Sequence, residues 1–127
     1  MSLTGRDFEP WLVRQFARRG SFTVLIILIA IREPTLFPIG ASYASVIGNE
    51  MSWPEMRRLL DASGLKWDGA ALFVAESPDG KPLIDAEAKA QLHAMQERII
   101  ADHARINEGA FFDRKGRLMR VEEIETS

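Results

Sequence analysis

The feature that most constrains the fold is a nearly uninterrupted apolar segment, FTVLIILIAI, at residues 22–31. It is rich in Val and Ile and shows no alternation of polar and apolar side chains. Such a pattern is typical of a strand buried on both faces, whereas a membrane-spanning helix needs about 20 apolar residues. Arg32 and Glu33 follow the segment directly. We therefore predict a central strand here, and neither a signal peptide nor a membrane anchor.

This strand has two apolar faces to bury. Side chains alternate along a strand, so Leu25, Ile27 and Ile29 share one face. Leaving four large apolar side chains of one face in water would cost about 6–12 kcal/mol. We expect the two later helices to cover one face and the first helix to cover only part of the other. A homodimer would cover the rest, with Trp11, Phe16, Leu25, Ile27 and Ile29 as interface residues.

Two segments have the apolar spacing of short amphipathic helices. The first helix is expected to begin near residues 7–9, because Pro10 is tolerated only in a first turn, and to end at Gly20. Further along, Ser52-Trp-Pro-Glu55 is a full capping box. In such a box the Ser hydroxyl and the Glu carboxylate each accept a hydrogen bond from the other residue's backbone N–H. A second helix is predicted directly after Ser52.

A third and longest helix is predicted from Asp85 to about residue 106. His103 falls on its apolar face, where we expect it to be packed. His93 and Glu97 fall on the opposite face, four residues apart, which is a spacing that two metal ligands on a helix can have. A metal site needs three or four ligands and the sequence offers no obvious others, so we expect no metal and no cofactor.

The remaining segments predict strands and turns. Residues 33–40 contain two prolines and predict a loop, and residues 113–116 (DRKG) predict a tight turn. The remaining strands are expected at residues 42–48, 70–75, 110–112 and 117–124.

This order of elements predicts one α+β domain over residues 1–127, with three helices packed on a mixed or mostly antiparallel sheet of about five strands. Residues 1–3 are compatible with an added expression leader, and we assign them no role. The length suits a single domain with a real hydrophobic core.

Charge and composition exclude several function classes. The chain has 16 Lys+Arg and 18 Asp+Glu, a net charge of -2, which gives no global attraction to nucleic acid or to anionic lipid. Basic residues cluster at positions 14–19 and 114–120, but glutamates follow the second cluster directly, so nucleic-acid binding is not expected. The absence of cysteine excludes disulfides, thiolate nucleophiles and Cys-ligated metals. We expect a cytoplasmic protein that does not bind a membrane.

Two functional hypotheses follow. The first is a small, soluble, non-enzymatic protein that acts by association, either with itself as a homodimer or with another protein. It is favoured because no catalytic constellation or phosphate-binding loop is present in the sequence. The alternative is a small-molecule-binding protein or an enzyme, whose aromatic pocket would be formed by Tyr43, Trp53, Trp67 and His103.

Overall fold

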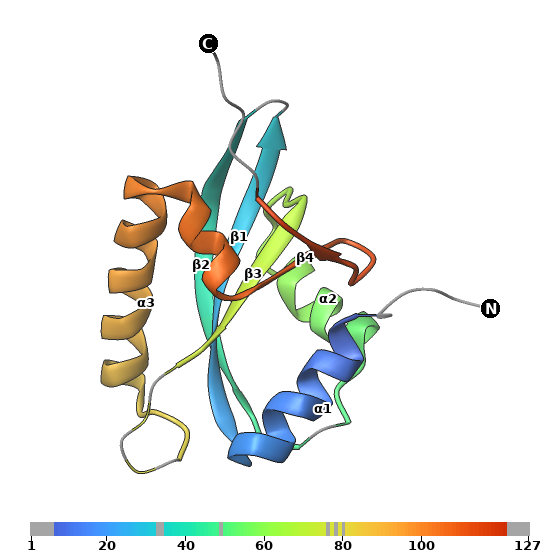
Figure 1. The fold of residues 1–127 in the computed structure, drawn as a ribbon, viewed down its shortest axis with the longest axis vertical. Helices are drawn as coiled ribbons and strands as arrows, with labels where there is room; N and C mark the ends of the chain where they lie inside the picture. The colour runs from blue at the N-terminus through green and yellow to red at the C-terminus, as the bar shows by residue number, and fades with distance from the viewer. Residues whose placement is uncertain are drawn as a thin grey trace, which may run out of the picture.

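An antiparallel sheet of five strands runs through the molecule, with helices on both of its faces (Figure 1). The structure is a computed structural model and describes residues 7–32, 35–48, 50–75, 77, 79 and 81–121. Along the chain the elements are α1 (Phe8–Arg19), β1 (Phe22–Arg32), β2 (Thr35–Val46), α2 (Trp53–Asp61), β3 (Gly69–Val74), α3 (Asp85–Ala101), the 3-10 helix η1 (His103–Glu108), β4 (Ala110–Asp113) and β5 (Leu118–Met119). The strand order is β2-β1-β3-β4-β5, and every pair is antiparallel. The α+β class is therefore confirmed.

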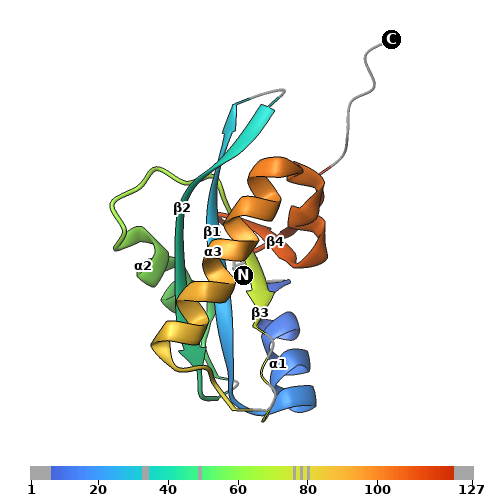
Figure 2. The same ribbon diagram turned by 90° about the vertical axis from the view of Figure 1, so that its left-hand side faces the viewer.

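The apolar segment forms β1, which lies between β2 and β3 and is buried on both faces, as predicted. Its two faces belong to two separate cores, one on each side of the sheet. The α1–α2 core contains Phe8, Leu12, Val24, Ile26, Leu28, Trp53, Met56 and Leu60. The α3 core on the opposite face contains Leu25, Ile27, Ile29, Leu92, Ile99 and Ile106. Figures 1 and 2 show α3 on one side of the strands and both α1 and α2 on the other.

The expected distribution of helices over the two faces was wrong. The helices α2 and α3 do not share a face: α2 covers β1 together with α1, while α3 and η1 cover the opposite face. The strands β2 and β3 are parallel to each other, since both are antiparallel to β1, so α2 is a crossover connection whose handedness fixes the face that it covers. The helix α3 connects the antiparallel neighbours β3 and β4 and is not bound to that face. Both faces of β1 are covered within one chain, so its burial does not require a second copy.

The predicted loop at residues 33–40 is mostly strand, because β2 already begins at Thr35. Pro38 is accommodated because β2 is an edge strand and because its register with β1 shifts between Leu28 and Ile29. Proline is tolerated at such irregular edge positions, where the ladder does not need its missing N–H. Pro38 therefore lies in a bulged hairpin arm, and Pro34 lies outside the described residues.

The third helix ends earlier than predicted. At Asp102 the backbone becomes extended, and the carboxylate of Asp102 accepts a hydrogen bond from the N–H of Ala104, which starts η1. His103 therefore lies in η1, where it is half-buried, and not on the apolar face of α3. Strand β5 is also shorter than predicted, and the expected residues 122–124 lie outside the described residues.

The turn between β4 and β5 has the predicted form, with Gly116 at a φ of 76°. The carboxylate of Asp113 accepts hydrogen bonds from the N–H groups of Lys115 and Arg117 and from the Arg117 side chain. Burial opposes ionisation of Asp113, but these hydrogen bonds outweigh it and lower the pKa of the carboxyl group. The turn thus holds an ionised side chain in a fixed position.

The capping box before α2 is formed as predicted. The Ser52 hydroxyl accepts from the Glu55 N–H at 3.3 Å, and the Glu55 carboxylate accepts from the Ser52 N–H at 3.4 Å. We expect Ser52→Ala and Glu55→Ala each to destabilise the chain by about 1 kcal/mol. The double variant should lose less than the sum, because both bonds stabilise the same turn. Denaturant unfolding measures this, and strict additivity would contradict it.

Candidate functional site

The four residues of the predicted aromatic pocket do not come together. Trp53 and Trp67 are fully buried in the α1–α2 core. Tyr43 packs on the opposite face, against the α3 core, and His103 belongs to η1 on that same side. The sheet separates the two pairs, so the structure gives no pocket shared by all four.

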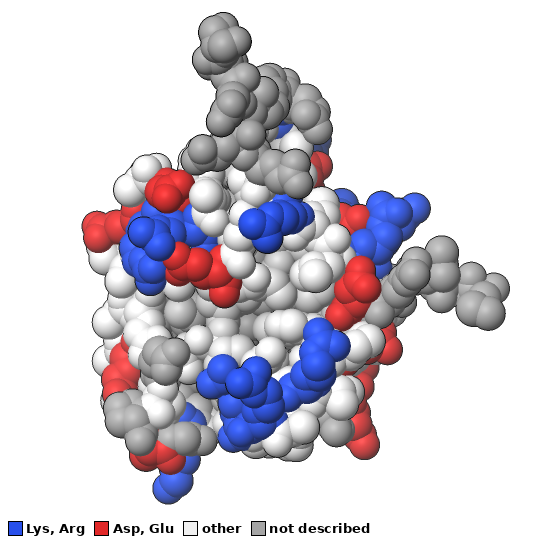
Figure 3. Space-filling view, viewed as in Figure 1, with Lys and Arg blue, Asp and Glu red and all other residues white. Residues whose placement is uncertain are grey.

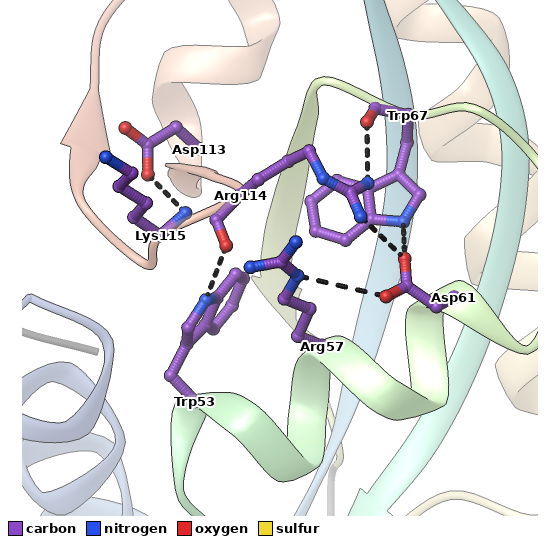
Figure 4. Close-up of polar contacts among 7 residues, drawn as sticks. All are labelled: Trp53, Arg57, Asp61, Trp67, Asp113, Arg114 and Lys115. Carbon is purple, nitrogen blue, oxygen red and sulfur yellow. Dashed lines mark hydrogen bonds and ion pairs between the residues drawn. The ribbon is translucent and has the colours of Figure 1, made fainter. Parts of the chain in front are cut away.

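Trp53 and Trp67 instead take part in a polar network that ties the β4–β5 turn to α2 (Figure 4). The Trp53 indole N–H donates to the backbone oxygen of Arg114 at 2.9 Å, and the Trp67 indole N–H donates to Asp61 at 2.9 Å. The Arg114 guanidinium donates to Asp61 at 3.0 Å and to the Trp67 backbone oxygen at 2.9 Å, and lies 4.3 Å from the centre of the Trp67 ring. Arg57 adds a longer ion pair to Asp61 at 3.8 Å.

In this network, the indole N–H groups that could bind a ligand already donate hydrogen bonds within the chain. The described residues contain no buried side-chain nitrogen or oxygen without a partner. Buried polar groups that are already paired stabilise a fold and leave little for a ligand to bind. The geometry therefore supports a structural role for Trp53 and Trp67.

Tyr43, His93 and His103 lie in three different elements, β2, α3 and η1. Partial burial, followed by the nearby Asp85 carboxylate, raises the pKa of the Tyr43 hydroxyl. His93 is exposed and lies 3.2 Å from Glu97, as their spacing predicts. Within the described ranges, no group of three or more His, Asp or Glu side chains could hold a metal ion.

The predicted interface residues are mostly inside the chain. Leu25, Ile27 and Ile29 are at most 2% exposed beneath α3 and η1, so they do not form a surface in this conformation. Trp11 and Phe16 of α1 are half-buried, and the Trp11 ring packs edge-on against Phe112 at 5.8 Å.

A feature that sequence reasoning missed is the free outer edge of β2. This strand is the first in the sheet order, and in the described part of the chain no strand pairs with its outer side. It is 12 residues long and contains no charged residue (TLFPIGASYASV). The absence of charged residues from residue 35 to 46 could have indicated this edge. The two prolines at residues 33–40 instead led to the prediction of a loop in the first half of the strand.

A second missed feature is an open groove of about 540 Å³ between α1 and α3. It forms where β3 extends beyond the end of β4. Strand β4 pairs only with Gly69 to Leu72, so Phe73 and Val74 of β3 have no partner in β4. Arg18 and Arg19 line the groove from α1, and Arg98 lines it from α3. The basic cluster on the first helix was visible in the sequence, but nothing in the sequence placed it opposite α3.

Comparison with known proteins adds no relative: no protein-family model, curated protein or solved structure shows a significant match to the chain. Among the helices that the structure describes, none is both long and apolar enough to span a bilayer.

Proposed function

We propose that this chain is a non-enzymatic association protein that forms a two-fold homodimer through the outer edge of β2. The observation that carries the proposal is an edge strand of 12 residues without one charged side chain. Natural proteins commonly protect long edge strands with lysines, prolines or bulges, because a free edge can pair with another chain. Here Pro38 and the register shift protect only the first half of β2.

The pairing of β1 indicates which backbone groups of β2 point outward. The N–H of Ala75 donates to the oxygen of Thr23, so odd-numbered residues of β1 direct their backbone groups toward β3. Even-numbered residues of β1 therefore bond to β2, including Ile26, which is paired with Ser42. By the same alternation, Ala41, Tyr43 and Ser45 of β2 present their N–H and C=O groups to the outside.

The β2 strand of a second copy can pair with these outward N–H and C=O groups. With a two-fold axis at Tyr43, Ala41 of one protomer would pair with Ser45 of the other, and the two strands would form about six main-chain hydrogen bonds. The side chains next to the axis are small, since Gly40, Ala41, Ser42 and Ala44 flank it. Because β2 is uncharged, two copies of it meet without repulsion.

Sedimentation velocity across micromolar concentrations tests the proposal. The wild-type chain is expected to shift from 14.3 kDa toward twice that mass as its concentration rises. Ser45→Lys should keep it monomeric, because a lysine would stand next to the edge where the partner strand has to pair. Ala90→Lys is the matched control, since Ala90 is exposed on α3 and the charge change is the same.

Two results would count against dimerisation through β2. A wild-type chain that sediments as a monomer up to the highest concentration would exclude the dimer. A dimer that survives Ser45→Lys, in a variant whose melting temperature is unchanged, would place the interface elsewhere and leave association itself intact.

A further inference from the structure

The groove between α1 and α3 has two chemically different ends. At the α1 end Arg18 and Arg19 lie side by side in the last helical turn. Among the described residues the Arg18 guanidinium has no ion pair or hydrogen bond, and Arg19 is bonded only to the neutral Gln15. Lys81 lines an adjoining cavity of about 280 Å³ that shares both arginines. Within the described ranges, no ion pair neutralises Arg18 or Arg19 at this end of the groove.

The α3 end of the groove is compensated. The carboxylate of Glu108 lies 2.8 Å from Arg98 and 2.6 Å from Arg105, and the carboxylate of Asp102 lies 3.8 Å from Arg105, so two carboxylates face two arginines. The hydrogen bond from Arg105, together with the charge of Arg98, lowers the pKa of Glu108 and keeps the carboxylate ionised. Figure 3 shows both ends: a basic cluster over the C-terminal part of α1, and acidic and basic side chains together over the corner of α3 and η1.

The floor between these ends is apolar. Trp11, Val74 and Met95 contribute half-buried apolar side chains, while Leu72 and Phe73 are almost fully buried beneath them and the polar residues Gln15 and Gln91 also line the groove. Figure 3 shows an uncharged surface between the two charged regions. The volume of about 540 Å³ falls in the range of small-molecule sites. An apolar floor with positive charge at one end matches a ligand with an apolar body and one anionic end.

We propose that this groove binds a small amphipathic anion, whose carboxylate or phosphate group lies against Arg18 and Arg19 and whose apolar body lies along Val74 and Met95. Arginine fits both kinds of oxyanion through paired N–H donors. Arginines in a last helical turn are also favoured by the helix dipole. The dipole alone does not explain why they line a groove with an apolar floor.

A small molecule fits this groove better than an acidic protein segment does. The neutralised corner at Glu108 ends the positive surface within the groove, whereas a long acidic segment needs basic charge along its whole path. The exposed edge of β3 in the groove comprises only Phe73 and Val74, which is too short to pair stably with an added strand.

Titration calorimetry with three probes tests the site: 1-naphthyl phosphate, neutral 1-naphthol, and inorganic phosphate, which lacks the apolar body. We expect 1-naphthyl phosphate to bind more tightly than either of the others. The double variant R18Q/R19Q should weaken its binding by about tenfold or more, because charge-assisted hydrogen bonds are lost. R14Q is the control on the same helix, since Arg14 does not line the groove, although it removes one positive charge where the double variant removes two. The measurements are made at physiological salt, which screens the long-range attraction between Arg14 and the anionic probe.

A blocking variant provides an independent readout. Ala94 is exposed on α3 and lines the groove, so Ala94→Phe should abolish binding of 1-naphthyl phosphate while leaving the melting temperature nearly unchanged. Equal binding of 1-naphthyl phosphate by wild type, R18Q/R19Q and Ala94→Phe would overturn the site. Equal affinity for 1-naphthol would overturn the anionic ligand class. Absence of binding at millimolar probe would overturn the proposal, as would binding of poly-glutamate alone, which would instead indicate an acidic protein partner.

Discussion

Replacing Ile27 by Asp is expected to unfold the chain. Ile27 is fully buried in the middle of β1 and packs in the α3 core, between Leu25 and Ile29 on the same face. A carboxylate at this position would have no partner and no water. The penalty for burying it is several kcal/mol, in addition to about 2–5 kcal/mol for the lost apolar packing. Together these losses are comparable to the whole stability of a domain of this size.

Circular dichroism and urea unfolding measure this outcome. Ile27→Val is the matched control, because it removes one methylene group and should cost only about 0.5–1.5 kcal/mol. A folded Ile27→Asp variant with nearly wild-type stability would show that α3 does not cover this face of β1 in solution. The variant also bears on the interface first inferred from sequence, which required Ile27 to be accessible.

Replacing Trp53 by Ala is expected to cost about 3–5 kcal/mol. Trp53 is fully buried, packs against Phe8 and Trp67 with ring centres 5.2 and 6.3 Å away, and satisfies the backbone oxygen of Arg114. Its removal leaves a cavity between α1 and α2 and a carbonyl without its donor. The β4–β5 turn would then lose one of its attachments to α2.

Two further variants separate these effects. Trp53→Phe keeps an aromatic ring but loses the indole N–H, so we expect an intermediate loss. Leu59→Ala, at an exposed position of the same helix, should change stability little. Urea unfolding compares the three variants. If Trp53→Ala is no more destabilising than Leu59→Ala, the network around Arg114 does not stabilise the fold, and a ligand-binding role for Trp53 becomes the better hypothesis.

The elements that the sequence predicts well are those specified by local chemistry. The apolar run at residues 22–31 has enough Val and Ile to specify a buried strand, and Ser52 with Glu55 specifies a helix start, because both signals act within a few residues. Gly116 similarly predicts its turn, since only the left-handed backbone closes the β4–β5 connection.

The errors concern properties that depend on distant residues. Whether a proline ends a strand or lies in a bulge depends on the neighbouring strand, as at Pro38. Which face a helix covers depends on the strand order, which periodicity does not contain. The end of α3 at Asp102 has a local cause in its carboxylate, but the apolar residue Ile106 continues the helical spacing and conceals it.

The candidate sites show the same limit. In the sequence, a buried structural tryptophan looks the same as one that lines a pocket. For Trp53 and Trp67, only their hydrogen bonds to Arg114 and Asp61 distinguish these two roles. The groove combines Arg18 with Phe73 and Arg98, which are far apart in the sequence. No motif spacing could have joined them.

The position of β1 also determines how the chain unfolds. One strand supplies side chains to both the α1–α2 core and the α3 core. We therefore expect the two halves of the molecule to unfold together. Subglobal opening is then confined to the periphery, such as β5 and the ends of helices. We therefore expect the amide protons of Ile26 and Ile27 to exchange with solvent only when the whole molecule unfolds, so that their exchange rates would report its global stability.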